Sequence, residues 1–162
     1  MPQKLTQSFV TKKQGDGEPV PTFKFWVEIK NIVVAEFKEC AGLSMEREVE
    51  RVEEGGVNDY VHVLPGRVKY SNITLKYGII EGGPSDGDVK KLWNWFQGGL
   101  YDGKVTRVDF SILLRDVKGD VVRRWSVSRG FPVKWEGPQL NTEGNQVAIE
   151  TLEIAHEGLK LS

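Results

Sequence analysis

Apolar and polar residues alternate along most of the chain, which is the pattern of strands that bury one face. In residues 69–77, for example, Ile73, Leu75 and Tyr77 share one side. The other segments predicted to be strands are residues 23–29, 32–37, 46–54, 57–63, 105–115, 121–128 and 147–156, of which 46–54 is dominated by charged residues. The pattern predicts an all-β framework of about seven or eight strands, whose edges must be hidden by closure or by pairing with another chain.

One segment has helical spacing instead. Its apolar positions follow the i, i+3, i+4, i+7 rule: Val89, Leu92, Trp93 and Phe96. Ser85 or Asp86 can cap the first turn, and Gly98 and Gly99 end the last. We therefore expect a helix over about residues 86–97 that packs Leu92, Trp93 and Phe96 against a sheet.

Residues 46–66 form a polar excursion. Glu46, Glu48 and Glu50 share one strand face, with Arg47, Val49 and Arg51 on the other. A glycine pair follows at positions 55 and 56, and the segment ends in Leu64-Pro65-Gly66. With so little apolar content, it is predicted to be a long hairpin with no core of its own.

Five tryptophans stand at positions 26, 93, 95, 125 and 135. Trp93 falls in the helix stripe, and Trp135 precedes Gly137 and Pro138 in a sequence suited to locking a corner, so we expect both in the core. Trp26 and Trp95 fall on nominally outward faces. Outward rings are typical of a carbohydrate-stacking surface or of a subunit interface, and both interpretations stay open.

Composition narrows the class of protein. The 162 residues favour one domain, expected at residues 22–162 after a polar N-terminal segment at 1–21. Valine occurs 20 times and alanine four times, which favours strands. The net charge is −1, so the chain does not have the excess of basic residues that is typical of nucleic-acid-binding proteins. Cys40 is the single cysteine, which excludes a disulfide-dense module. No signal-peptide block or membrane-spanning run is seen, so we expect cytoplasmic synthesis and no stable membrane insertion.

The sequence has none of the common motifs for catalysis, metal binding or phosphate binding. His62 and His156 are far apart, and with one cysteine there is no zinc spacing. No phosphate loop or nucleophile elbow is present. The sequence therefore predicts no catalytic residue, no cofactor and no metal, and an enzyme is not expected.

Several blocks in a fixed order resemble the tail-tube (inner-tube) proteins of contractile phage tails and phage-tail-like contractile injection systems. The resemblance spans residues 23 to 159, and its fold is also similar to that of the type VI secretion tube protein. The blocks that carry it are residues 25–29 (FWVEI), 40–48 (CAGLSMERE), 54–58 (EGGVN), 64–66 (LPG), 70–76 (YSNITLK), 92–95 (LWNW), 132–138 (PVKWEGP) and 148–159 (AIETLEIAHEGL).

The resemblance implies a mainly β fold, an antiparallel β-sandwich or partial barrel with one flanking helix. It implies homo-hexameric rings that stack into a hollow tube, with a sheath protein outside and baseplate or spike and terminator or cap proteins at the ends. Contraction of the sheath would drive the tube through a target envelope, and the lumen would conduct protein or DNA cargo. By this resemblance the particle would be either a phage tail or an injection system.

The resemblance also suggests roles for individual residues. In the family such an excursion contacts the neighbouring ring, which assigns inter-ring contacts to Val52, Gly55, Gly56, Asn58, Tyr60 and Leu64. A mobile surface hairpin is the alternative. Outward-facing polar positions are candidates to line the lumen, or equally to face the sheath or solvent: Glu46, Glu48, Glu50, Asn72, Thr74 and Lys76. The competing function is a monomeric β-sandwich carbohydrate-binding module.

Overall fold

The computed structural model describes residues 23–30, 33–53, 55–56, 59–79, 85–139 and 148–162. The N-terminal segment expected at residues 1–21 lies outside this range. The described elements are β1 (Lys24–Ile29), β2 (Val33–Phe37), β3 (Glu39–Ala41), β4 (Met45–Val52), β5 (His62–Tyr70), β6 (Ile73–Gly78), α1 (Asp86–Gln97), β7 (Val108–Arg115), β8 (Val121–Glu136), β9 (Ile149–Ala155) and β10 (Gly158–Leu161).

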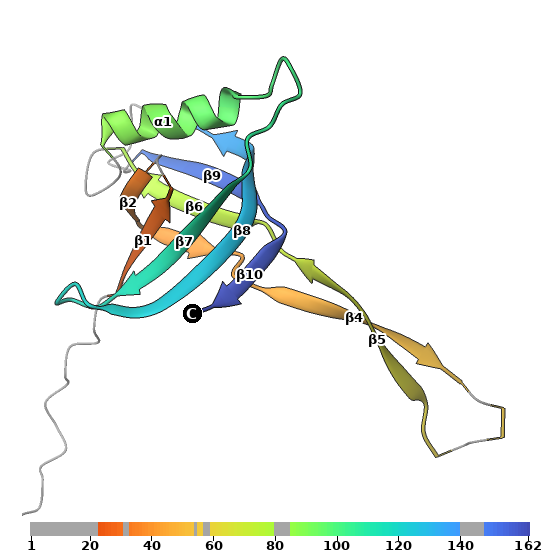
Figure 1. The fold of residues 1–162 in the computed structure, drawn as a ribbon. Coiled ribbons are helices and arrows are strands. Elements are labelled where there is room, and N and C mark those ends of the chain that lie inside the picture. Colours follow the sequence, from red (N-terminus) through yellow and green to blue (C-terminus); the bar gives the residue numbers. More distant parts are fainter. Residues whose placement is uncertain (1–22, 31–32, 54, 57–58, 80–84, 140–147) are drawn as a thin grey trace, which may run out of the picture.

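Eight strands form one antiparallel sheet in the order β2-β1-β7-β8-β9-β6-β3, with β10 paired to β8. The sheet curves around a core, and α1 lies across one end of it (Figure 1). Among the described pairings, none joins the end strands β2 and β3, so the barrel is partial rather than closed. The expected mainly β fold with one flanking helix is confirmed. The remaining pair, β4 and β5, forms a separate two-stranded sheet that projects away from the body (Figure 1).

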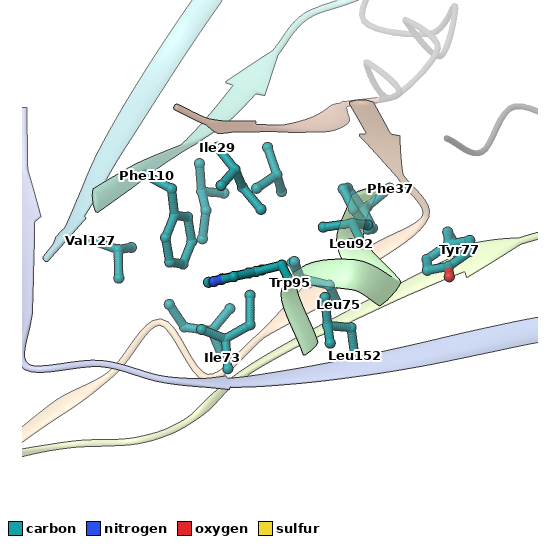
Figure 2. Packing of buried hydrophobic residues seen from close by; sticks show 13 residues of the cluster. Ile29, Phe37, Ile73, Leu75, Tyr77, Leu92, Trp95, Phe110, Val127 and Leu152 are labelled. Atoms are coloured by element: carbon teal, nitrogen blue, oxygen red, sulfur yellow. The ribbon is translucent and has the colours of Figure 1, made fainter. Parts of the chain in front are cut away.

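The core fills the concave side of the sheet. Its members come from six strands and the helix: Val27, Ile29, Phe37, Ile73, Leu75, Tyr77, Leu92, Trp95, Phe110, Ile112, Val127, Leu152 and Ile154. The alternation predicted for Ile73, Leu75 and Tyr77 is confirmed, since each is at most 1% exposed. Figure 2 shows Trp95 reaching from α1 into the middle of this cluster.

The helix has the predicted bounds but presents a different tryptophan to the core. Ser85 caps it, with the Asp88 N–H donating to Ser85 Oγ at 3.3 Å. Trp95 is 6% exposed and Trp93 is 41% exposed. The expectations that Trp93 lies in the core and that Trp95 faces outward were therefore both wrong. Leu92, Trp95 and Phe96 also fit helical spacing. When this face of the helix packs on the core, Trp95 Nε1 donates to the Thr106 carbonyl oxygen at 2.9 Å.

Three strands differ from the sequence pattern. The expected strand at 69–77 is split, because β5 ends at Tyr70 and β6 begins at Ile73. The strand expected at 121–128 continues to Glu136, so that β8 has 16 residues. It bends at Arg129, whose φ is 52°, and at Gly130, where a Cβ would lie 2.5 Å from the Phe110 ring. This bend lets β8 pair with β7 along its first part and with β9 along its second.

Candidate assembly surfaces

The two-stranded sheet is here called the hairpin arm, residues 45–70. Its strands pair from Met45 opposite Tyr70 to Val52 opposite His62. The excursion expected at 46–66 is therefore longer, and Leu64-Pro65-Gly66 lies inside β5 instead of closing a loop. A nine-residue strand such as β5 extends about 30 Å, so the arm reaches well beyond the body.

The arm has no core. All eight residues of β4 are exposed, and no residue of β4 or β5 belongs to the core cluster of the described chain. Its exposed apolar side chains include Met45, Val49, Val63 and Leu64, each about half exposed or more. An isolated two-stranded ribbon is marginally stable in water at best. The described contacts therefore give the arm no buried apolar core that would stabilise it by itself.

The root of the arm is fixed to the body by polar contacts. Ser44 Oγ donates to Ser71 Oγ at 2.8 Å, and the Ser71 N–H donates to the Ser44 carbonyl at 3.3 Å. His156 Nε2 lies 3.0 Å from the Ser71 carbonyl oxygen, and its ring lies against that of Tyr70, with centroids 5.3 Å apart. These contacts hold the direction in which the arm leaves the body.

The inter-ring candidates lie in the outer half of the arm. Val52 ends β4, Tyr60 is 61% exposed against His62, and Leu64 stands opposite Glu50. Gly55 and Gly56 follow β4, and a Cβ at either would meet nothing within 4 Å. Asn58 lies outside the described residues. The structure therefore brings the described candidates to one projecting end, and their contact with a neighbouring ring stays a prediction.

The lumen candidates fall on two separate parts of the molecule. Glu46, Glu48 and Glu50 lie on the arm, where Glu48 pairs with Lys69 and this contact raises the pKa of the lysine. The other three lie on the body at or near β6. There Asn72 Nδ2 donates to Glu153 Oε1 at 2.7 Å, and Lys76 Nζ donates to Glu39 Oε1 at 2.9 Å, with Thr74 between them in sequence. The six do not form one continuous strand face.

The packing residues meet at α1. Trp135 of β8 lies edge-on to Trp93, with ring centroids 5.1 Å apart, and also contacts Phe96 and Tyr77. Leu92 is fully buried, whereas Gly137 is exposed and Pro138 is partly buried just beyond β8. Of the five tryptophans, all within the described residues, only Trp93 is classed as exposed. A row of outward rings for stacking sugars is therefore not seen.

Unpaired strand edges are the feature that sequence reasoning could not locate. β2 and β3 end the main sheet, and β10 pairs with β8 on one side only. Both outer edges of the arm are also unpaired in the described pairings. Exposed edges are sites where another chain adds strands. The body and the arm thus both have strand edges with backbone groups that could pair with another strand.

The described residues show little that could support chemistry. They contain no group of three His, Cys, Asp or Glu side chains placed to hold a metal ion. Burial, with a smaller effect from Glu39, raises the pKa of Cys40 from 9.0 to about 12, which keeps the thiol protonated. Burial and a hydrogen bond to Glu150 raise the pKa of Tyr77. No described helix is long and apolar enough to cross a membrane.

Comparison with known families gives a match along nearly the whole chain. The model of the family described as T4-like virus tail tube protein gp19 matches residues 21–160. Comparison with curated protein sequences found no match.

Solved structures with a similar fold include three parts of contractile injection systems. One, from the PVC sheath–tube complex of an extracellular contractile injection system in its extended state, has a TM-score of 0.72 at 22% identity, covering 90% of this chain and 93% of that one. The anti-feeding prophage (AFP) baseplate gives 0.69 at 24% identity, covering 92% and 97%. The AFP tube-terminating cap gives 0.73 at 21% identity, covering 96% and 98%.

Proposed function

Because this chain belongs to the T4-like virus tail tube protein gp19 family, we propose that it is the repeating subunit of a tube made of stacked homo-hexameric rings. The family match makes it a tail tube protein, and the ring and the stack are the proposed form of the assembly. The supporting observation is the hairpin arm, which projects from the body without a core and carries unpaired edges. Such an element is explained by contact with a further copy.

The arm is proposed to bridge successive rings. Its outer half, with Val52, Tyr60 and Leu64, would meet the body of a subunit in the next ring. Backbone pairing would supply affinity there, and alternate side chains would set the register. The root contacts at Ser44 and Ser71 would transmit the position of one ring to the next.

The remaining partners follow from the same role. The PVC and AFP chains come from a sheath–tube complex, a baseplate and a tube-terminating cap. We propose that this tube likewise has a sheath outside, a baseplate at one end and a cap at the other. The lumen would conduct protein or DNA cargo after assembly in the cytoplasm. In this proposal contraction of the sheath drives the tube through the target envelope, so the tube subunit requires no catalytic group.

The test is direct. The purified chain is imaged by negative-stain electron microscopy, with its mass measured by analytical ultracentrifugation. Rings with six-fold symmetry and tubes of stacked rings are expected. Deletion of residues 52–60 is expected to leave a folded subunit, by circular dichroism, that forms no stacks. A strictly monomeric wild-type chain would contradict the proposal, and normal long tubes from the deletion variant would contradict the role of the arm.

A further inference from the structure

The strand register divides the hairpin arm into two unlike faces. Residues directly opposite each other in an antiparallel pair lie on the same face. At the bulge two residues of β5, Gly66 and Arg67, oppose Glu48, after which the pairing continues with Val49 opposite Pro65. The basic face therefore consists of Met45, Arg47, Val49, Arg51, Val63, Pro65, Val68 and Tyr70. The acidic face consists of Glu46, Glu48, Glu50, Val52, His62, Leu64, Arg67 and Lys69.

The two faces carry opposite formal charge. The basic face has two guanidinium groups and no carboxylate. The acidic face has three carboxylates against Arg67 and Lys69, and Lys69 is already paired with Glu48. Each face also exposes apolar surface, Val49 at 53% on the basic face and Leu64 at 48% on the acidic one. Both faces therefore have the composition of a contact surface.

The charges also match in spacing. Arg47 and Arg51 are four residues apart on β4, as are Glu46 and Glu50. At about 3.4 Å per residue, each pair is separated by about 14 Å. A basic face laid along the acidic face of a second arm can therefore place both guanidinium groups near carboxylates at once. Two basic faces, or two acidic faces, would oppose like charges.

A cyclic ring requires an interface between two different surfaces of the same subunit. Neighbours in a cyclic ring meet through two different patches, and each subunit carries both. Resting on the proposed function, we propose that the arms of adjacent subunits within a ring pack side by side, the basic face of one on the acidic face of the next. The occupant of each face is thus a second copy of this chain. The apolar side chains supply buried area, and the charges select the orientation.

Charge reversal tests the pairing. The basic-face variant is Arg47→Glu with Arg51→Glu, and the acidic-face variant is Glu46→Arg with Glu50→Arg. Each alone should raise the concentration needed for ring formation by about tenfold or more, because like charges would then meet across the interface. An equimolar mixture of the two should restore rings, since alternating subunits close in an even-numbered ring. A chain carrying all four changes should also restore them.

The controls separate this inference from the proposed function. Circular dichroism of each variant confirms folding. Arg47 donates to the Gly66 carbonyl oxygen at 3.5 Å within the arm, so the test is repeated with the single variants Arg51→Glu and Glu50→Arg, which leave Arg47 unchanged. Normal rings from the acidic-face variant, with none from the basic-face variant, would show that the basic face meets the body and would overturn the pairing. Rescue of the basic-face variant by wild type alone would overturn it too. Failure of the wild type to form rings would instead count against the proposed function.

Discussion

Gly42 stands between β3 and the arm, where the backbone passes very close to Asn72. Its φ is +85°, and a Cβ there would lie 1.9 Å from the Asn72 carbonyl oxygen. Gly42→Ala is therefore expected to destabilise the protein by about 2–5 kcal/mol, from left-handed strain and overpacking together. Urea unfolding followed by tryptophan fluorescence measures the change. Gly55→Ala, which meets nothing within 4 Å, is the control and should change stability by about 0.5 kcal/mol or less.

Cys40 and Tyr77 predict a loss of stability in alkali. Both groups have a pKa raised by burial, and that of Cys40 rises from 9.0 to about 12. Above the unfolded pKa the unfolded thiol is deprotonated while the folded one is still protonated, so the folded state binds more protons and stability falls as pH rises from 9.0 to about 12. Urea unfolding at about pH 8 and about pH 10.5 should show this decrease.

Cys40→Ala should flatten that decrease without abolishing it, because Tyr77 contributes in the same direction. In the native wild type at about pH 8, Cys40 should also react slowly with a thiol reagent and rapidly once urea is added. A rapid native reaction would contradict the burial of the thiol.

At the residue scale the sequence predicted side-chain direction well in the strand with the cleanest alternation, β6. Ile73, Leu75 and Tyr77 point inward as expected because a strand has only two faces. The helix tryptophans were harder, since Leu92 has apolar neighbours at both i+1 and i+3. Trp95, rather than Trp93, lies in the core, where its indole N–H donates to the Thr106 carbonyl oxygen. This partner lies outside the helix, so the helix sequence alone does not reveal it.

At the element scale, α1 offers a matched pair of substitutions. Trp95 is 6% exposed and in the core, whereas Trp93 is 41% exposed and contacts the rings of Phe96 and Trp135. Trp95→Ala should cost about 3–5 kcal/mol. Trp93→Ala loses a stacked contact with Phe96 and an edge-on contact with Trp135 at the surface, and it should cost about 1–2 kcal/mol. Chemical denaturation of both variants measures the difference. Equal losses would show that α1 is not oriented as described.

The ends of strands were least predictable at proline and glycine, because these residues occur both in turns and inside bulged or bent strands. Pro65 and Gly66 are typical of turns, yet both lie inside β5. Proline is tolerated there because the outer edges of the arm are free, and Gly66 lies at the bulge, where a Cβ would approach the Glu48 carbonyl oxygen to 3.0 Å. In β8, Gly130 likewise allows a bend within one strand rather than ending it.

At the scale of the whole molecule, the resemblance in ordered sequence blocks led to the tube family, while the residues alone gave an all-β chain with one helix and a coreless excursion. Which strands lie at the edges could not be derived, because edge position depends on pairings between distant segments such as β3 with β6 and β8 with β9. The lumen candidates show the same limit. Their alternation could be read along the chain, but the separation of Glu46 from Lys76 onto arm and body could not.

Hydrogen exchange connects these edges to the assembled state. In an antiparallel edge strand, alternate N–H groups point away from the sheet and exchange readily unless another chain pairs with them. On assembly we therefore expect amide protection to increase at alternate residues of β10 and across the arm, relative to the basic-face variant kept unassembled below its ring-forming concentration. β7 is the control, because it pairs with β1 and β8 on its two sides and should be protected in both states. If these edges exchanged as fast in assembled tubes as in the unassembled variant, copies of the chain would not be pairing with them, and the tube would have to be held together by side chains alone.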